Sequence, residues 1–151
     1  MANNHTAGAA ARTFAPSELC QRMLAKTSKG TCGPCILYLE DGTIFYGRAC
    51  GAEGTATGEV CFNTSLEGYF EVMTDPSYAG QIVTMTYPQI GNYGIDETDV
   101  QSAFPGDAVR PASAPAMRGM IVRDMCTTPS NWRSAVSVPE YLRAHGIVAI
   151  E

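Results

Sequence analysis

The part of this 151-residue chain that most limits its fold is the run from residue 58 to residue 94, where turn residues and apolar residues alternate. Residues 60–62 alternate as in a half-buried strand, and the polar residues after them end that pattern. Residues 69–73 carry apolar side chains at helical spacing, which indicates one short helix packed on a sheet. An Asp-Pro-Ser turn follows at residues 75–77, and residues 82–87 have the composition of a strand that a proline ends. The run therefore predicts a strand, a helix, a turn and a strand, in that order.

The rest of the chain supplies further strands and one more helix. Residues 35–40 and 43–48 are strand-like stretches joined by an Asp-Gly pair, which favours a tight hairpin turn. Residues 137–140 form a capping box, which predicts a helix that Gly146 ends. Residues 147–150 are apolar, as expected of a buried strand. Together these elements predict an α/β fold with a mixed sheet and few helices.

The run at residues 58–94 closely resembles the amino-terminal domain of the small subunit of glutamine-hydrolysing carbamoyl phosphate synthase. Other motifs of that family occur in the same order on both sides of it. They are Leu39-Glu40-Asp41-Gly42-Thr43, Gly119 through Asp124, Asn131-Trp132-Arg133-Ser134, and Tyr141 through Ile147. The resemblance covers roughly residues 36–151. It implies the swivelling β/β/α architecture of that family for residues 35–151, after a flexible amino-terminal extension over residues 1–34.

The resemblance also implies a function that belongs to a larger assembly. In the family, the small subunit hydrolyses glutamine and passes ammonia to a large synthetase subunit, which makes carbamoyl phosphate from bicarbonate and ATP for arginine and pyrimidine synthesis. The glutaminase triad lies in a carboxy-terminal domain, and this sequence ends at Glu151, before the stretch that leads there. We therefore expect a non-catalytic domain that docks onto the large subunit and onto the glutaminase domain. Apolar surface is expected where those partners would lie, at positions that the sequence does not specify.

The resemblance implies that one residue of this chain touches substrate. In the family, the serine of the Asp-Pro-Ser-Tyr turn, here Ser77, lies against the glutamine pocket of the neighbouring domain and helps to bind glutamine. A hydroxyl on a rigid turn suits that task, because it can donate and accept while Pro76 fixes the backbone. The alternative is that Ser77 only completes the turn, since serine is common in turns. No catalytic residue, cofactor or metal is assigned to this chain, and ATP and a metal ion are expected on the large subunit.

Composition limits the possible partners and locations. The net charge is -5, and the ten Lys and Arg residues are scattered. No nucleic-acid partner is expected, because binding to phosphates needs a basic face. No apolar run is long enough to span a bilayer, and the first thirty residues lack the apolar core of a secretory signal. The chain is expected in the cytoplasm with no membrane partner, although an organelle-targeting role of the basic amino-terminal segment stays open.

The six cysteines raise an alternative function. Cys32-Gly33-Pro34-Cys35 has the form of a thioredoxin active site, which would make the chain a thiol-disulfide oxidoreductase. That chemistry needs the first sulfur at a helix N-terminus, whereas a strand-like stretch follows here, so an incidental pair is favoured. Zinc needs four ligands, and the chain has no second Cys-x-x-Cys pair. A free-standing interaction module, with no glutaminase domain beside it, is the remaining alternative.

Two further features concern packing rather than chemistry. Trp132 is expected to be a core or interface anchor. The stretch between Asp99 and Met117 is rich in Pro and Ala and longer than the family pattern, which predicts a surface loop.

Overall fold

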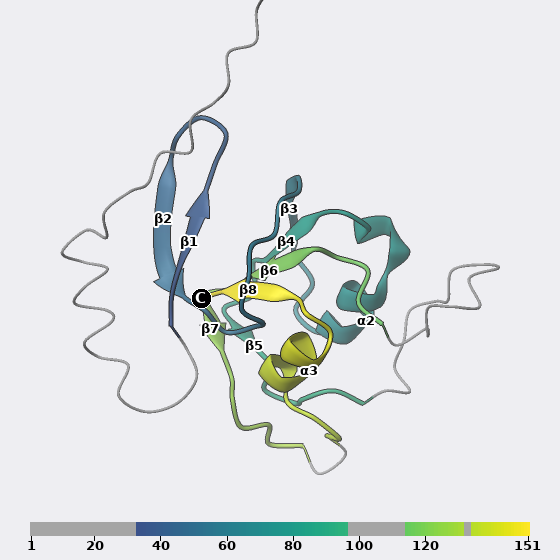
Figure 1. The fold of residues 1–151 in the computed structure, drawn as a ribbon. Helices are drawn as coiled ribbons and strands as arrows, with labels where there is room; N and C mark the ends of the chain where they lie inside the picture. The colour runs from purple at the N-terminus through teal and green to yellow at the C-terminus, as the bar shows by residue number, and fades with distance from the viewer. Residues whose placement is uncertain (1–32, 97–113, 132–133) are drawn as a thin grey trace, which may run out of the picture.

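The computed structural model describes residues 33–96, 114–131 and 134–151 (Figure 1). The strands are β1 Pro34–Tyr38, β2 Ile44–Arg48, β3 Val60–Asn63, β4 Ile82–Met85, β5 Gln89–Ile90, β6 Gly119–Ile121, β7 Asp124–Met125 and β8 Val148–Ile150. The helices are α2 Tyr69–Thr74, the short 3-10 helix η1 Pro76–Tyr78, and α3 Val138–Ala144. The predicted α/β class with few helices is confirmed in the part of the chain that is described.

Four parallel strands form the central sheet, in the order β3, β4, β6, β8. The hairpin predicted around the Asp-Gly pair is confirmed as antiparallel β1 and β2, while β5 and β7 form a separate parallel pair. Parallel and antiparallel pairing therefore coexist, as predicted for a mixed sheet. β3 lies at one edge of the central sheet, and β8 lies at the other edge, where the hairpin meets it (Figure 1).

The strand register divides the side chains of the central sheet between two faces. The first face carries Val83, Met85 and Met120, which are all buried. The second face, here called the open face, carries Val60, Phe62, Ile82, Thr84, Ile121, Val148 and Ile150, none of which is fully buried. The hydrophobic core therefore lies on one side of this sheet.

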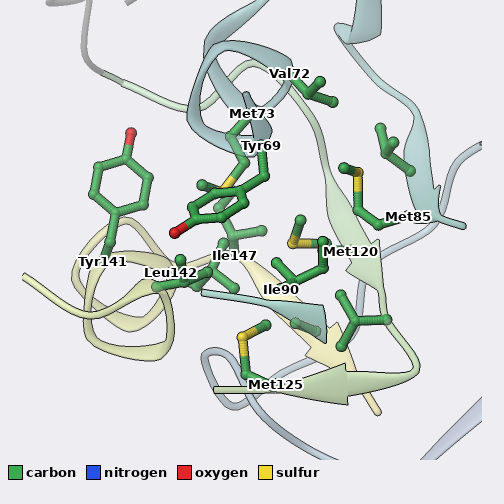
Figure 2. Close-up of a cluster of buried hydrophobic side chains, with 14 of the residues drawn as sticks. Tyr69, Val72, Met73, Met85, Ile90, Met120, Met125, Tyr141, Leu142 and Ile147 are labelled. Carbon is green, nitrogen blue, oxygen red and sulfur yellow. The ribbon is translucent and has the colours of Figure 1, made fainter. Parts of the chain in front are cut away.

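Two short helices cover the first face and form the core with it (Figure 2). Their buried apolar residues are Tyr69, Phe70, Val72 and Met73 from α2, and Val138, Tyr141 and Leu142 from α3. The two helices meet where the rings of Phe70 and Tyr141 pack edge to face, with their centroids 5.3 Å apart. Helices of this length are not stable alone in water, so burial against the sheet holds them in place.

A tyrosine hydroxyl takes the place of a side-chain cap at the start of α2. The N-cap residue, Gly68, has a φ of 78° and offers no side chain. The hydroxyl oxygen of Tyr93 instead accepts from the backbone N–H groups of Gly68 at 2.7 Å and of Tyr69 at 3.3 Å. The Tyr69 hydroxyl in turn donates to the carbonyl of Gly94 at 2.7 Å. The loop at residues 91–94 is therefore part of the scaffold that orients α2.

The predicted start of α3 is confirmed, whereas the predicted end of β4 is wrong. The capping box of α3 is confirmed, since the Ser137 hydroxyl accepts from the Glu140 N–H at 3.4 Å and the Glu140 carboxylate accepts from the Ser137 N–H at 3.2 Å. The strand predicted over residues 82–87 is too long, because β4 ends at Met85. Its neighbour β3 ends at Asn63. The Asn63 carbonyl accepts the last backbone hydrogen bond between the two strands, from the Thr86 N–H at 3.1 Å.

The hairpin is joined to the end of β8 through Arg48 and Glu151. The Arg48 N–H donates to the Glu151 carbonyl at 2.8 Å, and the Glu151 N–H donates to the Arg48 carbonyl at 2.9 Å. The Arg48 guanidinium also pairs with the Glu151 carboxylate. Gly47 is buried at this junction, where a Cβ atom would overlap the Glu151 carbonyl and the Ile150 side chain. The junction therefore requires glycine at position 47.

Several predictions from the sequence concern residues outside the described ones. Cys32, Trp132 and most of the connection between Asp99 and Met117 lie there. The extension predicted over residues 1–34 also lies almost wholly outside, so the boundary between residues 34 and 35 stays a prediction.

Replacing Gly47 by alanine should lower the free energy of unfolding of the chain by about 1–3 kcal/mol, because extra atoms would be forced into a packed junction. Gly33→Ala is the matched control, because a Cβ atom there would meet no atom within 4 Å. The control should change the free energy of unfolding by less than about 0.5 kcal/mol. Urea denaturation followed by circular dichroism measures both variants, and equal stabilities would contradict the close packing of the hairpin against β8.

Candidate functional site

The predicted substrate-binding residue, Ser77, lies in the middle of η1, between α2 and β4. The Asp75 carboxylate accepts from the Ser77 N–H at 2.8 Å, which is the bond to a residue two positions on that such turns favour. Pro76 occupies the first position of η1 and restricts its backbone. Ser77 itself is exposed, so its hydroxyl faces outward while its backbone is held.

Tyr78 attaches η1 to the central sheet. Its ring is partly buried and packs against the hydrophobic core. Its hydroxyl oxygen accepts from the side-chain amide nitrogen of Asn63 at 2.9 Å, and Asn63 is the last residue of β3. Ser77 therefore stands beside the edge strand of the central sheet.

Exposed apolar side chains gather in two places. On β3 and the turn after it, Phe62 is 71% exposed and Leu66 is 73% exposed. On the hairpin, the exposed apolar side chains are Ile36, Tyr38, Phe45 and Tyr46. Groups of exposed apolar side chains commonly mark contact surfaces. The structure thus has exposed apolar side chains at these two places, and their role as partner surfaces stays a prediction.

A hollow of about 810 Å³ lies at the amino-terminal ends of the parallel strands. Its lining comes from the residues that precede β3, β4, β6 and β8, and it includes Gly80 but not Ser77. The ionisable side chains among its lining residues are Arg118 and His145, and these residues include no Cys, Asp or Glu. Among these lining residues there is therefore no cysteine that His145 could activate and no carboxylate that could orient it.

His145 is engaged with its own helix. Its Nδ1 lies 3.0 Å from the carbonyl oxygen of Tyr141, and its ring centroid lies 4.3 Å from that of the Tyr141 ring. Among the described residues, no cysteine or serine side chain bonds to the imidazole.

Three cysteines lie in surroundings that disfavour nucleophilic chemistry. Cys50 is only 2% exposed. Burial raises the pKa of the Cys35 thiol, and burial together with the Glu59 carboxylate raises the pKa of the Cys61 thiol. A raised pKa lowers the fraction of thiolate at neutral pH, and the thiolate is the reactive form.

Cys35 also lacks the position that a thioredoxin-like site needs. It lies within β1, paired with Gly47, and not in the first turn of a helix. A strand supplies no helix dipole to lower the pKa of a nearby thiol. The described half of the Cys-x-x-Cys motif is therefore a strand residue, while Cys32 lies outside the described residues.

Metal-binding and membrane-spanning features are absent from the described residues. Among residues 33–96, 114–131 and 134–151, no three His, Cys, Asp or Glu side chains come together as a metal ion would require. No helix in these ranges has the length and apolar run needed to cross a bilayer.

Comparison with known proteins decides the family. The family model described as carbamoyl-phosphate synthase small chain, CPSase domain, matches residues 37–151. The chain belongs to this family. The carbamoyl phosphate synthase small chains of Solidesulfovibrio magneticus, Xanthomonas axonopodis pv. citri and Thermotoga maritima are 53%, 54% and 51% identical to it over 116, 117 and 116 residues. These alignments cover 77%, 78% and 77% of this chain.

The chain spans little more than a quarter of the length of those small chains, since the aligned parts make up 28%, 27% and 27% of them. The resemblance found in the sequence is thus confirmed, and the mixed α/β architecture is consistent with a carbamoyl phosphate synthase small-chain domain. Ser77, Asn63 and Tyr78 all lie within the matched residues.

Sequence reasoning identified Ser77 in this small-chain domain but not the contact that holds its turn. Asn63 and Tyr78 are 15 positions apart, and no local pattern links a strand end to a later tyrosine. The apolar edge at β3 did have a signal, because Val60 and Phe62 alternate with more polar neighbours. Alternation shows which residues share a face but not which face is covered.

Cys35 should react with iodoacetamide more slowly at pH 7 than the same cysteine in the urea-unfolded chain, because burial raises the pKa of its thiol. The rate should rise with pH along a titration whose midpoint lies above that of the unfolded chain. Mass spectrometry with fragmentation measures labelling of Cys35 separately from Cys32. A midpoint below neutral pH would instead support a redox-active thiol.

Proposed function

We propose that this domain supports glutamine hydrolysis in a carbamoyl phosphate synthase without carrying out the reaction itself. The remainder of the small chain would hydrolyse glutamine, and a large subunit would combine the ammonia with bicarbonate and ATP to make carbamoyl phosphate. ATP and its metal ion are assigned to that large subunit. The observation that carries the proposal is the exposed hydroxyl of Ser77 on a turn with a fixed backbone.

The hydroxyl of Ser77 forms no hydrogen bond within the turn. The backbone N–H of Ser77 bonds to Asp75, but its side chain has no hydrogen-bond partner among the described residues. A serine that served the turn through its side chain would bond back to the local backbone. A hydroxyl can donate or accept, and glutamine carries groups of both kinds, so Ser77 suits a role in binding glutamine.

Ser77→Ala in the complete enzyme should raise the KM for glutamine about three- to tenfold, as expected for the loss of one hydrogen bond. Carbamoyl phosphate synthesis from ammonia supplied directly should be unchanged, because that route bypasses glutamine binding. Thr127→Ala is the matched control, because it removes an exposed hydroxyl after β7 that has no hydrogen-bond partner among the described residues. Steady-state rates with each nitrogen source test the proposal, and an unchanged KM for glutamine in Ser77→Ala would remove the assigned role.

The β3 edge is the proposed contact with the glutaminase part of the small chain. Phe62 and Leu66 are exposed there, and the bond between Asn63 and Tyr78 brings η1 to the same edge. Phe62 lies on the open face and the bond between Asn63 and Tyr78 lies on the other face, so a glutaminase domain that covers the edge itself would contact both Ser77 and Phe62. This contact accounts for large apolar side chains that are otherwise left in solvent.

The hairpin is the proposed contact with the large subunit. Its exposed apolar residues, Ile36, Tyr38, Phe45 and Tyr46, lie at the opposite edge of the sheet from β3 (Figure 1). Two separate apolar surfaces suit a domain that docks onto two partners.

Phe62→Thr should lower the melting temperature of the full-length small chain by roughly 3–8 °C, because the apolar burial of Phe62 against the glutaminase domain would be lost. In the 151-residue chain the same substitution should cost less than about 2 °C, because Phe62 is already 71% exposed. Threonine is chosen because it is well tolerated in strands. Differential scanning calorimetry of both chains tests this contact, and equal shifts would contradict it.

The two alternative functions have less support. The position of Cys35 in β1 and the raised pKa of its thiol disfavour a thiol-disulfide oxidoreductase. A free-standing interaction module would still need a partner for the β3 edge, and no observation favours a partner outside the synthase. A cytoplasmic location, with no nucleic-acid or membrane partner, stays a prediction from the sequence.

A further inference from the structure

The backbone bonds of η1 fix the shape of the turn but not its place on the sheet. The Tyr78 N–H donates to the Asp75 carbonyl at 3.1 Å, and the Gln81 N–H donates to the Tyr78 carbonyl at 3.0 Å. All of these partners lie within the turn or next to it. A single short 3-10 turn of this kind needs contacts with other elements to hold its orientation.

Tyr78 makes such contacts in two ways. Its ring packs against the hydrophobic core, and its hydroxyl oxygen accepts from Asn63 at 2.9 Å. Ser77 directly precedes Tyr78 in the same turn, so any rotation of η1 that breaks the bond to Asn63 also moves the Ser77 hydroxyl.

Both the oxygen and the nitrogen of the Asn63 side-chain amide form hydrogen bonds. Its oxygen accepts from the Ser65 N–H at 2.8 Å, which leaves the amide nitrogen directed at the Tyr78 hydroxyl. The backbone carbonyl of Asn63 accepts from both the N–H and the hydroxyl of Thr86, each at 3.1 Å. Asn63 is thus held by the turn after β3 and by the residue that follows β4, which gives η1 a fixed point of attachment.

We infer that Asn63 and Tyr78 are positioning residues, which set the place of the Ser77 hydroxyl relative to the glutamine that it contacts. This inference rests on the proposed role of Ser77. A binding group must be held to within about 0.5 Å of its productive position, and a hydrogen bond from an oriented amide provides that restraint. Neither side chain has to touch glutamine.

Tyr78→Phe tests the inference in the complete enzyme, because it removes the hydroxyl and keeps the ring in the core. The KM for glutamine should rise about two- to tenfold, as expected for the loss of one neutral hydrogen bond. The rate with ammonia and the melting temperature should change little. Tyr87→Phe is the matched control, because Tyr87 also packs against the core but its hydroxyl has no hydrogen-bond partner among the described residues. It should leave all three measurements unchanged.

Substitutions at Asn63 separate positioning from general packing. Asn63→Asp should retain nearly the normal KM for glutamine, because a carboxylate can accept from both the Ser65 N–H and the Tyr78 hydroxyl. Asn63→Leu, which has a similar size and no polar group, should raise the KM as Tyr78→Phe does. The double variant Asn63→Leu with Tyr78→Phe should be no worse than Asn63→Leu alone, since both changes break the same bond.

The outcomes distinguish this inference from the proposed function. If Ser77→Ala raises the KM for glutamine while Tyr78→Phe and Asn63→Leu do not, the positioning role is overturned and the role of Ser77 stands. If Ser77→Ala has no effect, both fail. If Tyr78→Phe lowers the melting temperature and the ammonia-dependent rate together with the glutamine-dependent rate, Tyr78 has a structural role only and the inference is again overturned.

Discussion

Burial of one face of a parallel sheet beneath two short helices is the interaction on which the rest of this structure depends. α2 and α3 contain six and seven residues, which is too few for a stable helix in water. Met73 and Leu142 have no exposed surface, so each helix is held by the sheet that it covers. A parallel sheet in turn needs helices to cover its apolar face. Because η1 follows α2 directly, this packing also determines where Ser77 can lie.

Local signals in the sequence predicted β1 to β4, β8, α2 and α3, but they did not predict β5, β6, β7 or the long-range arrangement. Asp75 and Pro76 specify the turn that carries Ser77, and these are interactions between residues close in sequence. The early end of β4 could not be predicted, because it depends on where β3 stops rather than on the sequence of β4. The bond between Asn63 and Tyr78 could not be predicted either, because it joins residues of two different elements. The binding role proposed for Ser77 came from family resemblance and not from the physical pattern, which left a simple turn residue possible.

The described residues separate positioning from chemistry. The thiols of Cys35 and Cys61 have raised pKa values, which disfavours the thiolate at neutral pH, and no cysteine or serine side chain among the described residues bonds to His145. What the domain offers instead is a hydroxyl on a fixed turn and apolar surface on two edges of a sheet. Such features gain a function only when another protein surface is placed against them.

The register of the central sheet has a consequence for how the domain folds during synthesis. Ile82 pairs with Gly119, Gly119 pairs with Val148, and the hairpin closes onto Glu151 through Arg48. Contacts between residues so far apart in sequence form slowly, because a long loop must close before any of them is made. The sheet therefore gains β8, and the hairpin its contact with Glu151, only after residues 148–151 have left the ribosome. Until then the nascent chain presents an unpaired strand edge at β6, and this interval is the one in which association with other chains would compete most strongly with folding.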